Sequence, residues 1–141
     1  MSSFTAPLVH DTEILQLLKN KTKIPKKDYV IIDVRDHDFA VLQNTYLGGN
    51  IPGAVNVPSR YFLEDVQKLI DDYKDVPQVY FHCALSQARA GFVDQRTYFQ
   101  VSVLQGGFEQ WYVKHRNDPS LIENHDPEAL KGLLFEYGID Q

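Results

Sequence analysis

The chain has 141 residues, of which 43% are hydrophobic and 23% are charged, and its formal net charge is −5. This length and composition predict a single globular domain spanning 1–141 and exclude disordered, collagen-like and coiled-coil chains. The negative charge argues against nucleic acid or an anionic membrane as a partner, and no apolar run approaches the roughly 20 residues of a membrane span.

The amino terminus and the cysteine content favour a reducing compartment. The opening residues, MSSFTAPLVHD, lack the basic region and apolar core of a secretory signal, and residues 1–10 are expected to be flexible. Cys83 is the only cysteine in the chain, so no internal disulfide can form. These features predict a cytoplasmic or nuclear protein.

The first half of the chain predicts two helices and two strands. Asp11 can cap a short helix whose apolar residues follow at helical spacing. After a basic connector at 21–27, residues 29–34 form a continuous apolar run, which is typical of a strand buried on both faces. Residues 54–57 predict a short strand, and 62–73 have the alternation of an amphipathic helix.

The second half continues the alternation of strands and helices. Strands are predicted at 78–82 and 101–104, with a short helix at 92–99 between them. A helix follows Gly107, and Pro127 can open a final one. Strands that alternate with helices predict an α/β domain around a mostly parallel sheet flanked by helices. The last part of the chain, 116–141, is expected to be a C-terminal extension with a short helix.

The stretch HCALSQAR directly follows an apolar strand and contains the candidate reactive residues. In a parallel sheet, ligands bind beyond the carboxyl ends of the strands, where Cys83 lies. The backbone amides of the following loop can turn inward to bind an anion, and Arg89 can supply a planar fork for two of its oxygens. The predicted oxyanion-binding residues are Ala84, Leu85, Ser86, Gln87, Ala88 and Arg89.

The same surroundings decide whether Cys83 reacts. A helix that starts near Arg89 would direct its N-terminal dipole at the loop and lower the pKa of the thiol. Cysteine and arginine at this spacing then fit attack on phosphorus, arsenic or sulfur. Spacing alone leaves open the alternative of a buried, inert thiol, because cysteine is among the most frequently buried residue types.

Four segments of the sequence together resemble the rhodanese fold, and within it the M-phase inducer phosphatases and the related small eukaryotic arsenate reductases. The matching segments, in chain order, are VIIDVRDHDF (30–39), GGNIPGAVNVPS (48–59), VYFHCALSQAR (79–89) and VLQGGFEQW (103–111). The resemblance implies a phosphocysteine mechanism with Cys83 as the nucleophile and Arg89 as the phosphate clamp. It also implies a rhodanese-like arrangement of sheet and helices.

Three further residues are expected to support the loop. Asp33 and Arg35 match charged residues that usually brace this fold beside the active-site loop, and a buried aspartate needs such a partner. His82 precedes the candidate nucleophile, and neighbours in a strand point to opposite faces of the sheet. We therefore expect His82 to be a hydrogen-bonded supporting residue rather than a general base.

The sequence departs from the family pattern after the loop. Ala90 and Gly91 stand where the family has Gly-Pro, and the stretch 90–100 is shorter than the helix and turn of the relatives. Residues 40–47 have the character of an insertion, and Asn50 occupies a position where histidine is common. The shortened stretch bears on activity, because its helix dipole is the one expected to activate Cys83.

Four functions are consistent with these residues. The first is a small cysteine phosphatase acting on phosphoesters, with phosphotyrosine or phosphothreonine proteins as candidate substrates. The second is an arsenate reductase, which would need glutathione or a glutaredoxin because the chain has no second thiol to resolve an adduct. A thiosulfate sulfurtransferase fits the loop length less well, and a phosphate-binding module with weak turnover fits the shortened helix.

The chain carries no loop carboxylate to protonate a leaving group. The candidates elsewhere are Asp36, Asp38, Asp94 and Glu109. The five histidines lack a close helical spacing, so no metal and no bound cofactor are expected. The expected partner is a phosphorylated protein or a small oxyanion, and the sequence does not predict an oligomeric state.

Overall fold

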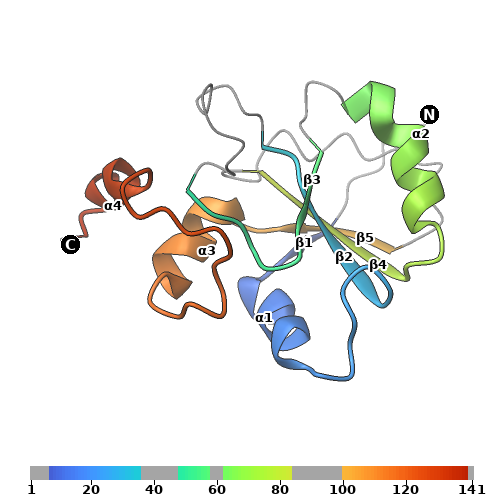
Figure 1. Ribbon diagram of the computed structural model, residues 1–141, viewed down its shortest axis with the longest axis horizontal. Helices are drawn as coiled ribbons and strands as arrows, with labels where there is room; N and C mark the ends of the chain where they lie inside the picture. The colour runs from blue at the N-terminus through green and yellow to red at the C-terminus, as the bar shows by residue number, and fades with distance from the viewer. Residues whose placement is uncertain (1–6, 36–47, 58–61, 84–99, 140–141) are drawn as a thin grey trace.

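The computed structural model describes residues 7–35, 48–57, 62–83 and 100–139, with backbone alone for 62–66 and 100. Within these residues, no helix has the length and apolar character needed to cross a membrane. The described elements form one sheet with helices packed on it, and the C-terminal residues lie at one end of the molecule, beyond α3 (Figure 1).

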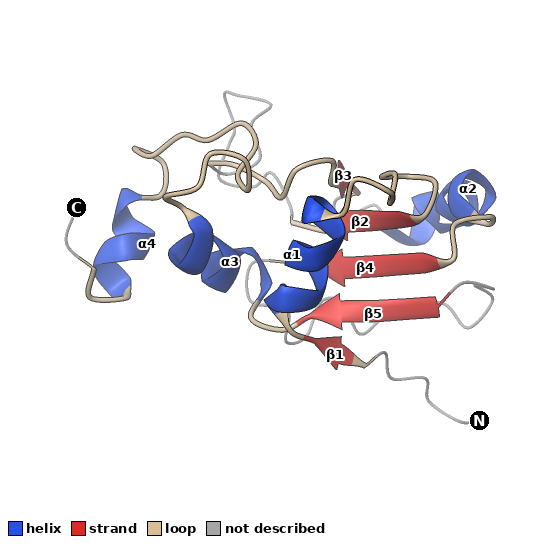
Figure 2. Cartoon of the chain, turned by 90° about the horizontal axis from the view of Figure 1, so that it is seen from below, coloured by secondary structure: helices blue, strands red, loops and turns tan. Residues whose placement is uncertain are grey.

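The sheet has five parallel strands in the order β1-β5-β4-β2-β3. Their bounds are Leu8–Val9 for β1, Tyr29–Asp33 for β2, Val55–Asn56 for β3, Gln78–His82 for β4 and Gln100–Leu104 for β5. The prediction of an α/β domain with a mostly parallel sheet is confirmed. Because the strands are parallel, their carboxyl ends lie at the same edge, as the arrowheads in Figure 2 show.

Four helices are present in the described residues. They are α1 (Asp11–Lys19), α2 (Phe62–Tyr73), α3 (Gly107–His115) and α4 (Lys131–Glu136). Helix α1 lies in front of the sheet in Figure 2 and α2 lies behind it. The sheet is therefore covered on both faces, which accounts for the continuous apolar run in β2, where every residue is buried.

The two faces of the sheet carry different cores. The core under α1 and α3, here called the aromatic-face core, contains Ile14, Tyr29, Ile31, Ile51, Tyr80, Leu104, Phe108, Trp111, Tyr112, Leu121, Ile122, Leu130 and Leu134. The core under α2, the aliphatic-face core, contains Val30, Ile32, Val34, Leu69, Val76, Val79, Phe81, Cys83, Val101 and Val103. Alternate residues of β2 and β4 enter opposite cores, as the period of two in a strand requires.

Three local expectations need correction. Residues 8 and 9 were assigned to a flexible terminus, yet they form β1 and pair with β5. Asp11 does not cap α1: the N-cap is His10 without a side-chain bond, and Asp11 instead accepts from His115 and Lys114. Helix α4 begins at Lys131 rather than at Pro127, which lies in the preceding turns. The expected helix at 92–99 lies outside the described residues.

Candidate active site

The candidate site lies at the carboxyl ends of β2 and β4, two neighbouring strands inside the sheet. Asp33, the last residue of β2, is paired in register with His82, the last residue of β4. The backbone beyond the strands continues this pairing, because the Val34 N–H donates to the His82 carbonyl over 2.8 Å. Cys83 follows at once, so the sheet fixes where the candidate reactive loop begins.

Cys83 is 5% exposed and its side chain belongs to the aliphatic-face core. Its carbonyl accepts a hydrogen bond of 3.0 Å from the backbone N–H of Phe108. That N–H lies in the first turn of α3, where helical donors have no partner within the helix. Helix α3 and β4 together therefore hold the backbone at Cys83. The expected oxyanion cradle at 84–89, including Arg89, lies outside the described residues.

Asp33 and Arg35 form a buried ion pair beside this point. The Arg35 Nε lies 3.0 Å from both carboxylate oxygens of Asp33, and a second guanidinium nitrogen lies 2.7 Å from Oδ2. That same nitrogen donates to the Gly49 carbonyl at 2.7 Å, and the guanidinium lies 4.1 Å above the ring of Phe108. Burial opposes ionisation of Asp33, but His82 and the Arg35 guanidinium outweigh it and hold its pKa below the usual value.

His82 and Cys83 point to opposite sides of the sheet, since the His82 ring stacks on Phe108 of the aromatic-face core at 6.4 Å between centroids. Nδ1 lies 3.2 Å from the Cys83 carbonyl, which can only accept, so Nδ1 carries the proton. Burial lowers the pKa of His82 despite the attraction of Asp33. Among the described residues, Nε2 has no hydrogen-bond partner and lies 3.9 Å from the Asp33 carboxylate.

Asn56 is a residue of this site that the sequence analysis did not single out. Its side-chain amide donates to the Asp33 carbonyl at 2.9 Å and to the Arg35 carbonyl at 3.1 Å. The edge strand β3 thus ties down the turn that follows β2. Asn56 is the last residue of β3 and is paired with Asp33 in the sheet, so an amide at the end of a short strand was the signal that could have identified it.

Of the four candidate acids, only Glu109 lies among the described residues. It lies in the first turn of α3, two residues after Gly107, and accepts a 3.5 Å hydrogen bond from the Tyr137 hydroxyl. Burial and repulsion from Glu136 raise the pKa of the Glu109 carboxyl. It is therefore more easily protonated than an ordinary glutamate. Its hydrogen bond to Tyr137 and its repulsion from Glu136 place it against the C-terminal end of α4.

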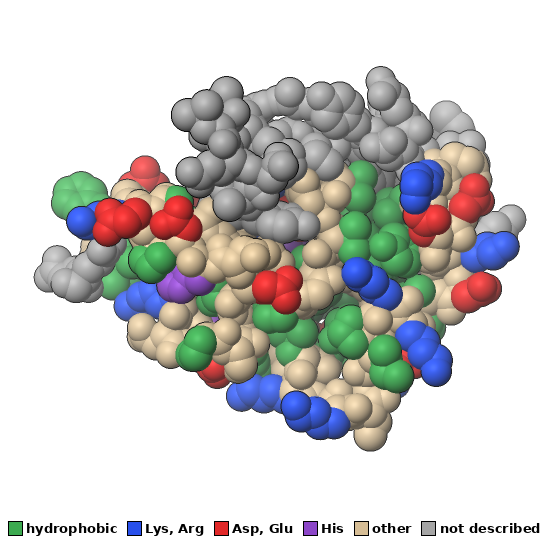
Figure 3. Space-filling view, in the orientation of Figure 1, with side chains coloured by type: hydrophobic (Ala, Val, Ile, Leu, Met, Phe, Trp, Pro, Cys, Tyr) green, Lys and Arg blue, Asp and Glu red, His purple; other side chains and the backbone are tan. Residues whose placement is uncertain are grey.

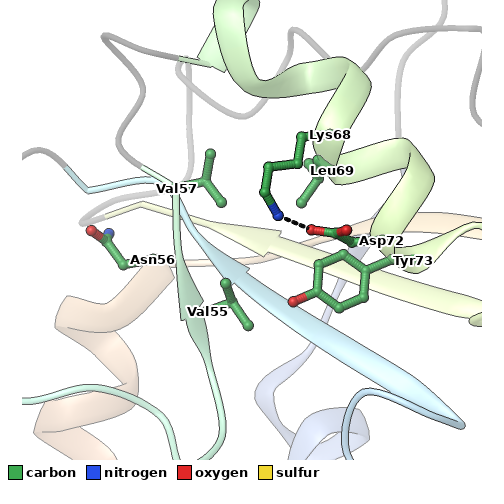
Figure 4. A pocket seen from close by; sticks show the side chains of 7 residues that line it. All are labelled: Val55, Asn56, Val57, Lys68, Leu69, Asp72 and Tyr73. Atoms are coloured by element: carbon green, nitrogen blue, oxygen red, sulfur yellow. Dashed lines mark hydrogen bonds and ion pairs between the residues drawn. The ribbon is translucent and has the colours of Figure 1, made fainter.

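A pocket of about 290 Å³ opens between β3 and α2 (Figure 4). Its lining residues are Val55, Asn56, Val57, Lys68, Leu69, Asp72 and Tyr73. Figure 3 shows apolar side chains between β3 and α2, bordered by charged side chains on the helix. Asn56 connects the pocket to the turn after β2, so the pocket lies beside the candidate site rather than within it. Across the described residues, no three His, Cys, Asp or Glu side chains gather as metal ligands.

Residues 14–114 match the sequence model of the family described as "Rhodanese-like domain". "Dual specificity phosphatase ibp1" of Schizosaccharomyces pombe is 30% identical over 119 residues, covering 66% of this chain and 81% of that protein. "Dual specificity phosphatase Cdc25" of Arabidopsis thaliana is 29% identical over 98 residues, covering 61% of this chain and 63% of that protein. These findings confirm the resemblance inferred from the four motifs.

Solved structures with the same fold include a phosphatase and a reductase. Ygr203w, described as a yeast protein tyrosine phosphatase of the rhodanese family, superposes with a TM-score of 0.66 at 20% identity, covering 90% of this chain and 98% of that one. The As-Sb reductase of Leishmania major gives a TM-score of 0.61 at 21% identity, covering 94% and 99%. At these identities the likeness establishes the fold.

Proposed function

The chain belongs to the rhodanese-like family, and from that premise we propose that it is a small cysteine-dependent phosphatase that hydrolyses phosphoesters. The observation that carries the proposal is the position of Cys83. It follows an interior parallel strand at the carboxyl edge of the sheet, and its carbonyl is bonded to α3. The similarity to two dual specificity phosphatases supports the same chemistry.

The proposed reaction has two displacements at phosphorus. The Cys83 thiolate attacks the phosphorus, the bond to the leaving oxygen breaks, and that oxygen takes up a proton as the alcohol or phenol departs. Water then attacks the phosphocysteine, the phosphorus–sulfur bond breaks, and phosphate and the thiolate are released. Arg89 and the loop amides would bind the equatorial oxygens, which carry the charge in the transition state.

The described residues would contribute by holding the backbone that leads into the loop. The Phe108 N–H and the His82 Nδ1–H both donate to the Cys83 carbonyl. A fixed carbonyl leaves the residue fewer conformations in which the thiolate can point away from the substrate, and such pre-orientation accounts for a large part of many rate enhancements.

An arsenate reductase is the second candidate, supported by the fold it shares with the As-Sb reductase of Leishmania major. In that reaction the Cys83 thiolate attacks the arsenic of arsenate, one arsenic–oxygen bond breaks, that oxygen leaves as water, and a thiol–arsenate adduct forms. An external thiol then attacks the Cys83 sulfur, arsenite leaves with the two electrons, and a mixed disulfide remains for a second thiol to reduce. The chain has a single cysteine, so glutathione or a glutaredoxin must supply these thiols.

One set of assays separates the candidates. Purified protein is incubated with p-nitrophenyl phosphate, with arsenate plus glutathione and glutaredoxin, and with thiosulfate plus cyanide, next to Cys83→Ser and Arg89→Lys variants. We expect phosphate release that both substitutions abolish, because serine is a poor nucleophile here and lysine cannot replace a planar fork. Thiol-dependent arsenite formation alone would favour the reductase. Thiocyanate formation alone would indicate a sulfurtransferase, and phosphate binding without turnover a binding module.

A further inference from the structure

A chain of contacts connects the C-terminal extension to the candidate site. It begins where residues 121–126 lie against the turn at 48–50. The Asn50 N–H donates to the Glu123 carbonyl at 2.9 Å, and the Glu123 N–H donates back to the Asn50 carbonyl at 2.8 Å. The C-terminal extension therefore pairs with the backbone of this turn, although the two segments are more than seventy positions apart in the sequence.

The side chain of Asn50 adds specific hydrogen bonds to this pairing of Asn50 with Glu123, here called the junction. It is 0% exposed, and its amide nitrogen donates to Glu123 Oε1 at 3.1 Å and to the Ile51 carbonyl at 3.0 Å. Its oxygen accepts from the Asn124 amide at 2.9 Å. Both amide hydrogens and the oxygen are satisfied, so no group of other hydrogen-bonding character fits this position without leaving a buried atom unpaired.

The turn then reaches the ion pair of the site. The Gly49 carbonyl, one residue before Asn50, accepts the 2.7 Å bond from Arg35. Gly49 has a φ of +144°, and a Cβ there would lie 3.0 Å from Ile122 and 3.3 Å from the Glu123 carbonyl. The C-terminal segment thus packs directly on Gly49, and the position of this carbonyl depends on the junction of Asn50 with Glu123.

From Arg35 the contacts run to Cys83. The guanidinium of Arg35 holds Asp33, the Asp33 carboxylate lies 3.9 Å from the His82 ring, and that ring donates to the Cys83 carbonyl. Each member is buried and in contact with the next. A displacement of the Gly49 carbonyl would change the partner of Arg35, and Arg35 is the partner that keeps the Asp33 charge satisfied.

We propose that Asn50 and Glu123 are positioning residues for the reaction at Cys83, acting through Gly49, Arg35 and the Asp33–His82 contact. The inference rests on the proposed function, since it concerns the reactivity of the same cysteine. Glu123 is an exposed residue of the C-terminal extension, and the Asp33–Arg35 ion pair that it supports is buried. The proposal therefore gives the extension a role in the site.

The test exchanges the hydrogen-bond donor and acceptor between residues 50 and 123. Asn50→Asp places a carboxylate oxygen against the Glu123 carboxylate and the Ile51 carbonyl, with no hydrogen between them. We expect kcat to fall about tenfold or more with little change in KM, the effect of about 1.4 kcal/mol of lost transition-state stabilisation. In the double variant Asn50→Asp/Glu123→Gln, the new amide can donate to the new carboxylate. It should recover part of the lost rate, because the contact between residues 50 and 123 is restored while the Ile51 carbonyl still lacks its donor.

The matched control is Glu128→Gln, the same change in the same extension at an exposed residue outside the chain of contacts. It should leave kcat unchanged. If Asn50→Asp does not fold, Glu123→Ala serves instead, because it removes the acceptor at an exposed position. Melting temperatures are recorded for every variant, so that rates are compared only between folded proteins.

A second readout keeps this inference separate from the proposed function. The rate at which iodoacetamide alkylates Cys83 and the affinity for inorganic phosphate are measured for each variant, and neither requires turnover. If the unmodified protein hydrolyses nothing, the proposed function fails, yet the junction still predicts slower alkylation in Asn50→Asp and recovery in the double variant. Folded single variants with unchanged kcat and alkylation, or recovery of the melting temperature without recovery of reactivity, would overturn the inference.

Discussion

The aromatic face of the sheet contains polar contacts within its core, whereas the buried side chains of the aliphatic face are valine, isoleucine, leucine, phenylalanine and the one cysteine. On the aromatic face, the Trp111 indole donates to the Leu121 carbonyl at 2.9 Å, and the Tyr80 hydroxyl donates to Glu13 at 2.6 Å. Aromatic residues with a polar end need such partners when they are buried. On this face, hydrogen bonds therefore fix the orientation of the buried side chains, in addition to the fit of their shapes.

The difference matters at the carboxyl edge, because consecutive residues enter opposite faces there. His82 lies with the aromatic side and is linked to Asp33 and Arg35, while the Cys83 thiol lies in the aliphatic core. The candidate nucleophile thus has an apolar environment on one side and a hydrogen-bonded backbone held from the other. Substitutions on the two faces should consequently have different effects on reactivity, even when their effects on stability are alike.

The largest expected effect comes from breaking the ion pair. Arg35→Met leaves the Asp33 carboxylate buried without its partner, and such a loss destabilises by about 3–5 kcal/mol. Urea unfolding monitored by tryptophan fluorescence measures it. The matched control is the double variant Asp33→Asn/Arg35→Met, which removes the buried charge as well and should recover part of the loss. A single variant within about 0.5 kcal/mol of the original protein would contradict the role of the pair.

Substitution of two neighbouring isoleucines allows a direct comparison of the two faces. Ile31 belongs to the aromatic-face core and Ile32 to the aliphatic-face core, and both are fully buried. Each substitution by alanine should cost about 2–5 kcal/mol, from lost transfer energy and the cavity left behind. Only Ile32→Ala opens space in the core that holds Cys83, so alkylation of the thiol should change more in this variant. Equal changes in both would show that the two cores do not act separately on Cys83.

The pH dependence of stability should report on His82. Burial lowers its pKa in the folded protein, so protons bind preferentially to the unfolded chain once the pH falls below the ordinary value of about 6.5. Stability should therefore decrease from about pH 6.5 downward, by at most about 1.4 kcal/mol per pH unit for one proton. Asp33, whose pKa is also lowered, contributes stability that is lost only at lower pH, below about 3.8.

The comparison is with His82→Asn, whose amide can still donate to the Cys83 carbonyl but does not titrate. Its melting temperature should vary less between pH 6.5 and pH 5 than that of the original protein. Identical slopes in the two proteins would mean that His82 takes up its proton equally easily in the folded and unfolded states.

The smallest expected effect lies on the outer side of α3 and α4. Burial and the Glu136 charge raise the pKa of Glu109, so its favourable contribution exists at low pH and is lost as the pH rises through the raised value. Glu136→Gln should stabilise the protein at pH 7 by no more than about 0.5 kcal/mol, because the pair is largely solvated. The gain should vanish near pH 4, where the Glu109 carboxyl, because of its raised pKa, is protonated and no longer carries a charge to repel. A gain of equal size at both pH values would exclude charge repulsion as its cause.

The sequence was sufficient for the strands that define the site. The apolar runs at 29–34 and 78–82 could be recognised as strands, because burial on both faces removes polar residues from a strand. The two-residue strand β1 was not, since Leu8 and Val9 are too few to show a period and their pairing with β5 is set only by the sheet.

The contacts around the ion pair were likewise predictable only where the partners are near each other in the sequence. Asp33 and Arg35 were predictable as partners because they are near neighbours at the end of a strand. The contacts of Asn50 with Glu123 and of Asn56 with the turn after β2 were not, because they join segments that are distant in the sequence and depend on the folded chain. In the sequence, Asn50 stood out only as a departure from the family pattern, and Asn56 only as part of a predicted strand.

The proposed function depends on a covalent bond between Cys83 and phosphorus during turnover. The most direct measurement is a rapid acid quench of the protein during hydrolysis of p-nitrophenyl phosphate, followed by mass spectrometry of the peptide that contains Cys83. We expect a phosphate adduct on the Cys83 sulfur that is absent from Cys83→Ser and decays at the rate of phosphate release. Phosphate release that persists in Cys83→Ser, or steady turnover with no adduct on this peptide, would contradict the proposed function.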